Sequence, residues 1–486
     1  MKNSILKNID KPTLIMYLIF IIVGWVCIYE ASYQSGQPSI FDVKYRSGLQ
    51  LIWIGISLVT AVALLFIEVK TYTSLAYIIY GGIILILIAT IFVAPNIKGS
   101  HSWLTFGVFS IQPAEFAKFA TALALAKLFG AHNFKNKSLI NKIMLTSILI
   151  VLPAAIILLQ KETGLALVFF AMTLMLYREG LSPYIILVFS MLIVIFIIMV
   201  MFASTPFLGI KEASLGRFVT INLVLIIAII ISGQYMERNS SIKTKHIFAV
   251  LFGIYFFASL FHIYIFKINF VYIAWFCTTA FFVYLIYNYV KKWKIKYLFP
   301  AIFVVGFVAY SYSVEYVFED VLQTHQQSRI KVLLGMENDP QGSAWNTNQA
   351  KIAIGSGGFW GKGFLKGTQT KLKFVPEQDT DFIFCTIGEE LGFVGSFAIM
   401  LLFVIFILRL IYMAERQTNV FSRVYGYCVI GIFLFHFVIN IGMVLGIMPV
   451  IGIPLPFFSY GGSSLLSSTI LLFVFLKIDA VRRVNR

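Results

Sequence analysis

The sequence predicts an all-α protein that crosses a membrane many times. Hydrophobic residues make up 59% of its 486 positions, charged residues only 12%, and the mean hydropathy is +0.89. Because soluble proteins carry roughly 25% charged residues, this composition excludes a soluble enzyme, a disordered chain and a nucleic-acid-binding module. The net charge of +17 is then best explained by Lys and Arg in cytoplasmic loops.

Apolar runs long enough to cross a bilayer, about 20 residues each, recur along the whole chain. They predict about fourteen transmembrane helices, near 13–30, 49–67, 74–94, 111–129, 141–159, 163–177, 184–203, 217–233, 246–264, 268–288, 297–313, 384–408, 424–447 and 458–477. The first run follows three lysines and ends without a small-residue cleavage pattern, so we expect an uncleaved span and not a signal peptide. The four cysteines have no metal-like spacing and are expected to be small buried residues.

The basic residues orient these spans. With a cytoplasmic N-terminus, 23 of the 38 Lys and Arg residues fall in cytoplasmic segments and seven in short outer loops, as the positive-inside rule expects. Both termini are then cytoplasmic, and the segment from about 314 to 383 lies outside. A loop of this length is usually functional or disordered, and its low Pro and Ser content favours order.

The predicted helix 111–129 carries a polar stripe. Gln112, Glu115 and Lys118 are spaced so that they share one face of a helix. Ionisable residues inside a membrane suggest a functional site, although Glu115 and Lys118 could simply pair with each other. Trp103, in the outer loop before this helix, belongs either to the interfacial aromatic belt or to the neighbourhood of that stripe.

The outer segment contains a Gly-rich stretch, 354–363. It fails the phosphate-loop pattern, because Ser356 stands where the pattern needs its first Gly, and Gly363 stands where Ser or Thr must follow Lys362. Glycines at this density allow tight turns or the close approach of the backbone to a ligand. Both interpretations stay open.

Three acidic residues lie where the outer segment re-enters the membrane: Glu377, Asp379 and Asp381. A carboxylate half shielded from water can have its pKa raised into the range of a general base. Alternatively, Thr380 or Asp381 caps the following helix. The Pro- and Gly-rich stretch 452–464 also falls on the outer side, and irregular backbone at membrane depth is tolerated only where it is buried or lines a cavity.

Six ordered blocks carry a resemblance to a known family. They cover 98–103, 111–118, 353–363, 375–384, 387–395 and 440–464. Together they resemble the SEDS family of cell-wall polymerases, of the RodA and FtsW type, and the stretches 361–369 and 440–446 are more similar to the RodA branch.

This resemblance implies a peptidoglycan glycosyltransferase that polymerises lipid II into β-1,4 glycan strands during cell elongation. Lipid II holds its sugar through an α-linked diphosphate to undecaprenol, so a β-linked product requires an inverting displacement. The implied partners are a class B penicillin-binding protein, which is a transpeptidase, and other membrane proteins of the elongation complex, with no nucleic acid. The implied location is the cytoplasmic (inner) membrane, with the active site on its outer face.

In the family, the Asp of the Thr-Asp-Phe-Ile-Phe block is the catalytic residue, which here is Asp381. We expect it to take the proton from the acceptor hydroxyl, while the cations of the substrate site stabilise the departing diphosphate. The expected substrate-binding residues are Trp103, Glu115, Lys118, Arg329, Lys362, Gln369 and Glu377. No organic cofactor is implied, and a divalent cation, Mg²⁺ or Mn²⁺, held by Glu377 or Glu115 is left open.

The chain departs from the family pattern in three ways. Ser102 stands where Arg usually precedes the Trp of the first block, and Glu162 stands where a Gln-Pro-Asp-Leu-Gly-Thr block has Asp. Most members have ten spans, so about four of the fourteen are expected to be inserted. The expected domains are 1–203 and 384–486 for the transmembrane core, 204–310 for the inserted helices and 311–383 for the large extracytoplasmic catalytic loop.

Two other classes of protein compete with the enzyme. One is a lipid II flippase with a path lined by Glu115 and Lys118, and the other is a non-catalytic scaffold of the cell-wall synthesis complex. A flippase needs a polar path open to both faces, whereas the polar blocks gather outside. This asymmetry favours the enzyme.

Overall fold

The computed structural model describes residues 8–33, 39–97, 99–107, 109–180, 184–208, 210–235, 240–264, 267–293, 297–322, 324–334, 336 and 345–484. These residues are mostly helical and form two compact units. The first unit combines Met1–Pro183 with Pro340–Arg486, and the second consists of Tyr184–Asp339. The second unit therefore interrupts the first in sequence.

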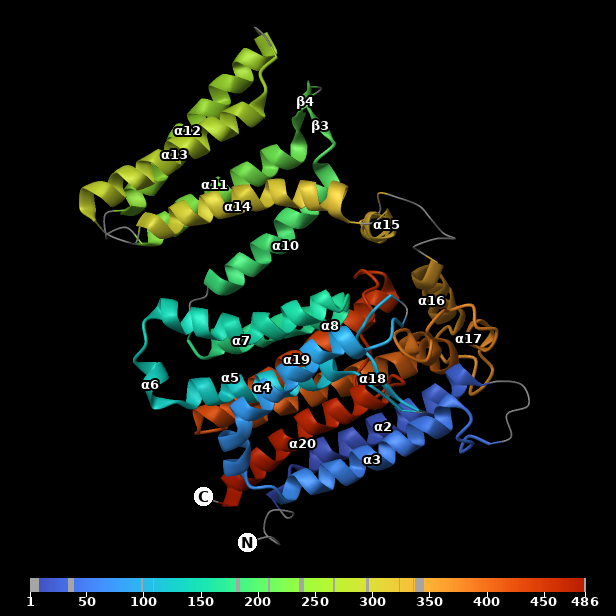
Figure 1. The fold of residues 1–486 in the computed structure, drawn as a ribbon. Coiled ribbons are helices and arrows are strands. Elements are labelled where there is room, and N and C mark those ends of the chain that lie inside the picture. The colour runs from blue at the N-terminus through green and yellow to red at the C-terminus, as the bar shows by residue number, and fades with distance from the viewer. Residues whose placement is uncertain are drawn as a thin grey trace. The chain divides into compact units, whose positions relative to one another are not determined.

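The first unit is a helical bundle with one small β-hairpin (Figure 1). The hairpin strands β1 (Leu104–Phe106) and β2 (Phe109–Ile111) are antiparallel. The helices are α2 (Lys11–Ser32), α3 (Arg46–Phe66), α4 (Val69–Val93), α5 (Pro113–Gly130), α6 (His132–Lys135), α7 (Leu139–Leu159), α8 (Thr163–Val168), the 3-10 helix η1 (Phe169–Met172), α9 (Thr173–Arg178), α16 (Trp345–Ser356), α17 (Thr368–Lys371), α18 (Ile383–Glu415), α19 (Val420–Leu445) and α20 (Gly462–Val484).

The second unit has its own helices and a second hairpin, β3 (Pro206–Phe207) with β4 (Ile210–Ser214). Its helices are α10 (Tyr184–Phe202), α11 (Leu215–Tyr235), α12 (Ser240–Tyr264), α13 (Phe270–Lys292), α14 (Leu298–Tyr316), the π-helix η3 (Val317–Val321) and α15 (Thr324–Leu333). Its core is built from α10, α11, α13 and α14 around residues such as Ile195, Leu225 and Leu285. Arg217 and Glu315 add an ion pair at 2.8 Å.

Among the described residues, 11 helices are long and apolar enough to cross a membrane. The other three predicted spans are also helical, but each differs from a plain apolar span. The helix near 111–129 is α5, which carries three charged residues, the segment near 163–177 is divided by η1, and α10 has a shorter apolar part. The prediction of an all-α polytopic membrane protein is thus confirmed.

Helix α5 is the centre of the first unit, where it packs against α4, α7, α19 and α20. Ala114, Ala117, Ala120 and Ala124 follow its axis and are at most 1% exposed. Within a membrane, small residues allow helix backbones to approach closely, which replaces the hydrophobic effect as the source of packing energy. The stripe of alanines therefore explains why neighbouring helices can pack closely against α5.

The N-terminus of α2 is tied to α18 by charge. Asp10 is the N-cap of α2 and accepts hydrogen bonds from Thr13 and from Nη2 and Nε of Arg409, the latter two at 2.7 and 3.0 Å. Burial alone would raise the pKa of Asp10, but these hydrogen bonds outweigh it and hold the pKa well below its ordinary value. Near this site, Arg416 pairs with the buried Asp479 of α20.

Candidate active site

The acidic segment before α18, residues 377–381, is fixed by three hydrogen bonds from two other parts of the first unit, α19 and the loop that follows it. The Ser459 hydroxyl donates to the Thr380 carbonyl at 2.6 Å, and the Tyr460 amide donates to the Asp379 carbonyl at 2.8 Å. The Asn440 side-chain amide of α19 donates to the carbonyl of Asp381 at 2.8 Å. Backbone contacts of this kind hold the segment in place and leave its carboxylates available for other partners.

Asp381 is partly exposed and lies beside the loop that connects α19 to α20. Gly452 in that loop has φ +70°, and a Cβ at this glycine would lie 3.4 Å from Oδ2 of Asp381. The N-cap position of α18 is Phe382, which makes no capping hydrogen bond through its side chain. The interpretation of Thr380 or Asp381 as the cap residue is therefore wrong, since the Thr380 hydroxyl instead donates to Glu377.

Arg46 is a cation of this site that the sequence did not single out. It begins α3, pairs with the buried carboxylate of Asp379 and lies with its guanidinium carbon 5.4 Å from the centroid of the Tyr460 ring. Half of its side chain is exposed (50%). Burial raises the pKa of Tyr460, although Arg46 opposes the shift, so this phenol stays protonated at neutral pH. Arg46 thus places positive charge on Asp379, which stands two residues before Asp381 in the sequence.

The Gly-rich stretch 354–363 docks backbone to backbone on a break in α18. Gly392 interrupts α18 with φ +67°, and a Cβ there would overlap the backbone nitrogen of Gly361. The amides of Lys362 and Gly363 donate to the carbonyls of Glu389 and Glu390 at 3.0 and 2.9 Å. The glycines are therefore explained by tight turns and close contact with the protein's own backbone.

Lys362 and Gln369 meet at the carboxylate of Glu389, which is fully buried in the first part of α18. The Lys362 ammonium lies 2.6 Å from Oε1 of Glu389. The same carboxylate accepts hydrogen bonds from the backbone amides of Thr368, Gln369 and Thr370 at 2.7 to 2.9 Å. Lys362, a predicted diphosphate ligand, is thus held in a cluster that anchors residues 362–370 to α18.

Glu115 and Lys118 form an ion pair inside the bundle, as the alternative from their spacing suggested. Their charged atoms are 2.7 Å apart and both side chains are at most 2% exposed. The Lys118 ammonium also lies 3.0 Å from Nε2 of His436, whose Nδ1 lies 3.0 Å from the carbonyl of Pro454. Because that carbonyl can only accept, Nδ1 carries the proton and Nε2 accepts from Lys118.

A hydrogen-bonded path connects this ion pair to Asp381. His436 and Asn440 are four residues apart on α19 and therefore lie on the same face. His436 donates to the carbonyl of Pro454, and Asn440 donates to the adjacent Ile453 carbonyl as well as to Asp381, at 2.8 Å each. The polar stripe of α5 thus lies behind the acidic segment and supports it through α19.

The two residues that depart from the family pattern, Ser102 and Glu162, form a hydrogen bond with each other. The Ser102 hydroxyl donates to the Glu162 carboxylate at 2.7 Å, and the backbone amide of His101 donates to the Gln160 carbonyl. Trp103 follows directly and leads into the β1–β2 hairpin, with its side chain partly exposed. Lys98, which begins the same sequence block, lies outside the described residues.

The other predicted site residues lie in different places. Glu377 is exposed in a turn with φ +53°, four residues before Asp381. Arg329 belongs to α15 of the second unit, and its side chain is outside the described residues. The residues that the structure describes contain no group of three or more metal-binding side chains. Of the two carboxylates considered as ligands of a divalent cation, Glu377 is exposed, whereas Glu115 is already paired with Lys118.

Together, the fold and the site define a polytopic helical membrane protein with a partly exposed carboxylate held at one end of its core bundle. The chain belongs to the FtsW, RodA and SpoVE family of cell cycle proteins, whose model matches residues 11–214 and 215–484.

Similar proteins cover nearly the whole chain. The peptidoglycan glycosyltransferase RodA of Treponema pallidum is 28% identical over 98% of both chains, and the stage V sporulation protein E of Bacillus subtilis is 26% identical over 98% of both. The peptidoglycan glycosyltransferase MrdB of Escherichia coli is 46% identical over 30% of this chain and 40% of its own.

Solved structures share the fold at lower identity. A chain from a peptidoglycan synthase complex, described for its coordination of polymerization and crosslinking, covers 98% of both chains with a TM-score of 0.61 and 20% identity. A mutant of the Thermus thermophilus rod shape determining protein RodA covers 97% of both, with a TM-score of 0.54 and 20% identity.

Proposed function

We propose that this protein is a RodA-type peptidoglycan glycosyltransferase that polymerises lipid II into β-1,4 glycan strands during cell elongation. The observation that carries the proposal is the position of Asp381. Asn440 donates to its backbone carbonyl, and the residue is partly exposed. Gly452, which has no side chain, lies beside its carboxylate. Relatives named as peptidoglycan glycosyltransferases support the reaction class.

In the proposed reaction Asp381 is the general base. Its carboxylate takes the proton from the 4-hydroxyl of the acceptor sugar while that oxygen forms a bond to the anomeric carbon of the donor. The bond from that carbon to the diphosphate oxygen breaks on the opposite side, so the configuration inverts and undecaprenyl diphosphate leaves with the electron pair. A positioned general base contributes about 10²–10⁴-fold to such a rate.

Arg46 is proposed to face the departing diphosphate. All three candidate cations are paired with buried carboxylates, but the Arg46 side chain is 50% exposed, whereas those of Lys362 and Lys118 are 24% and 1% exposed. A guanidinium suits this role because its planar fork binds phosphate oxygens in pairs. A divalent cation held by Glu377 would add neutralisation of the leaving-group charge.

The proposed topology has fourteen membrane-spanning segments with both termini in the cytoplasm, which places the acidic segment on the outer face of the cytoplasmic membrane. These fourteen are the 11 long apolar helices together with α5, the segment α8–α9 and α10. The proposed partner is a class B penicillin-binding protein, which would crosslink the glycan, together with membrane proteins of the elongation complex. The likeness to a chain of a peptidoglycan synthase complex supports this partner.

The test uses purified full-length protein with its penicillin-binding partner in liposomes that contain fluorescent lipid II. We expect Asp381→Asn to lower the rate of polymerisation by at least about 10²-fold, with unchanged thermal stability. Glu377→Gln, in the same turn, is the matched variant and should mainly raise KM for lipid II. Equal rates for wild type and Asp381→Asn would refute the assignment of the base. If neither protein polymerises and both carry lipid II across the bilayer, the protein is a flippase.

A further inference from the structure

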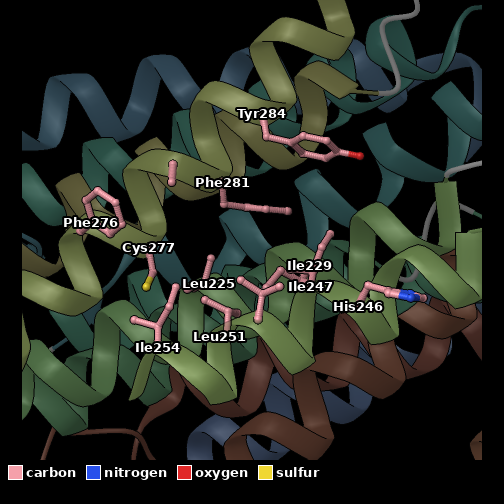
Figure 2. A pocket seen from close by; sticks show the side chains of 12 residues that line it. Leu225, Ile229, His246, Ile247, Leu251, Ile254, Phe276, Cys277, Phe281 and Tyr284 are labelled. Carbon is pink, nitrogen blue, oxygen red and sulfur yellow. The ribbon is translucent and has the colours of Figure 1, made fainter. Parts of the chain in front are cut away.

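The second unit contains an apolar cavity of about 580 Å³ between α11, α12 and α13 (Figure 2). This volume is within the range of small-molecule sites, about 300–1,000 Å³. Its walls are aliphatic and aromatic side chains, apart from His246, the Cys277 thiol and the Tyr284 hydroxyl. Val250 and Phe276, on its lining, are 62% and 68% exposed, so the cavity is open at the side. None of these residues belongs to the site around Asp381.

The two ends of the cavity differ in polarity. Figure 2 shows His246 and Tyr284 at one end and Ile254 and Phe276 at the other. From His246 to Ile254 the helix rises about 12 Å at about 1.5 Å per residue, which is most of one leaflet of a hydrocarbon core about 30 Å thick. A second cavity of about 510 Å³ shares Ile254 and Phe276 and continues along the same two helices. The two cavities together therefore form one mostly apolar groove between α12 and α13, which runs along the helix axes as a lipid acyl chain would.

Positive charge gathers at the end marked by His246. Lys291 and Lys292 are the last two residues of α13, at the same end of the unit as His246 in α12. The Lys292 ammonium lies 3.1 Å from the Tyr297 hydroxyl, which keeps it at this end of the unit. At the opposite end, Lys267 is the one basic residue among the described residues that line the groove. By the positive-inside rule, the more basic end faces the cytoplasm.

We propose that the groove between α12 and α13 binds one anionic glycerophospholipid of the cytoplasmic leaflet, with an acyl chain in the cavity and its phosphate at Lys291, Lys292 and His246. Helices α12 and α13 are both apolar enough to cross the membrane, so their groove is surrounded by lipid chains. An acyl chain in the cavity makes dispersion contacts with the lining side chains of α12 and α13, which do not contact each other across the cavity. Basic residues next to a membrane helix add the selectivity for anionic headgroups. This site is independent of the proposed catalysis.

The experiment uses the full-length protein in nanodiscs of phosphatidylcholine that contain a small fraction of phosphatidylglycerol with a photoactivatable diazirine in its acyl chain. After irradiation, peptide mapping should place the adducts within 246–254 and 276–284. The same diazirine on phosphatidylcholine should label these peptides at least about ten-fold less. Unlabelled phosphatidylglycerol should compete for the site, and unlabelled phosphatidylcholine should not.

Two variants separate the headgroup from the chain. Lys291→Gln with Lys292→Gln should lower labelling by about thirty-fold, which corresponds to about 2 kcal/mol at about 1 kcal/mol per basic residue. Lys267→Gln, at the opposite end of the groove, is the matched control and should change labelling less than two-fold. Ala280→Phe, which fills the cavity from α13, should also abolish the adducts. Equal labelling by both lipids, or full labelling of the Ala280→Phe variant, would overturn the proposal.

Discussion

Replacement of Lys118 by methionine tests whether the polar stripe of α5 supports the site or binds substrate. Lys118→Met removes the charge and keeps most of the side-chain volume. It leaves the Glu115 carboxylate buried without its cation, and loss of one partner from a buried ion pair costs about 3–5 kcal/mol. It also removes the donor to Nε2 of His436, and an unsatisfied buried acceptor adds about 1–3 kcal/mol.

The double variant Glu115→Gln with Lys118→Met is the decisive comparison. It carries no buried charge, so it should recover about 2–3 kcal/mol relative to Lys118→Met alone. Thermal unfolding in a fixed detergent measures this difference. At about 2.1 cal/mol/K of unfolding entropy per residue, the first unit of about 330 residues shifts by about 1.4 °C per kcal/mol, so the midpoint should rise by roughly 3–4 °C from the single to the double variant.

Polymerisation of lipid II is measured for the same three proteins, well below their unfolding temperatures. If the ion pair only supports the loop that holds Asp381, the double variant regains much of the activity that Lys118→Met loses, with little change in KM. If Lys118 binds the diphosphate, the stable double variant stays inactive. Equal stability of the single and double variants would refute the reasoning from buried charge.

Three further predictions concern positioning and stability. Asn440→Ala removes two hydrogen bonds of 2.8 Å that fix the carbonyls of Asp381 and Ile453, so we expect kcat to fall about 10–100-fold with KM nearly constant; an unchanged kcat in the liposome assay would contradict the role of Asn440. Gly392→Ala should lower the free energy of unfolding by at least about 1–3 kcal/mol, because of its positive φ and its contact with Gly361, whereas Gly253→Ala, in open space on α12, should be neutral or stabilising in the same thermal scan. Since the pKa of Asp10 is lowered in the folded protein, its stabilisation is complete above the ordinary pKa of 3.8 and is lost as the pH falls below it; Asp10→Asn should flatten this part of a pH titration of the unfolding midpoint, and an unchanged slope would argue against it.

The sequence predicts the membrane helices well because their signal is local. An apolar run of about 20 residues identifies a span without any knowledge of its neighbours. The internal pairing of Glu115 with Lys118 is similarly local, since i, i+3 residues meet on a helix. The segment 163–177 was harder, because the 3-10 turn η1 that divides it has no distinct pattern in its apolar residues.

The remaining contacts of the site could not be predicted because they join distant parts of the chain. Arg46 and Asp379 are 333 residues apart, and Asn440 is 59 residues from Asp381. Before folding, Arg46 is one of several outer basic residues, and nothing nearby in the sequence marks it as different. Asn440 did carry a signal, since it is a polar residue within an apolar span and stands in one of the blocks shared with the family.

The contacts of α19 explain how one partly exposed carboxylate can be held accurately at the edge of a membrane. His436 and Asn440 hold two adjacent carbonyls, those of Pro454 and Ile453, and Asn440 also holds Asp381. A shift of α19 relative to α5 would break the contact of His436 with Lys118 before it could move Asp381. The buried charges of α5 therefore help to fix the register of α19 even if they never touch substrate, because a displaced α19 would lose the hydrogen bond between Lys118 and His436. The direction of the hydrogen bonds supports this view, since Lys118, His436 and Asn440 can all keep their hydrogen-bond partners in only one register of α5 and α19.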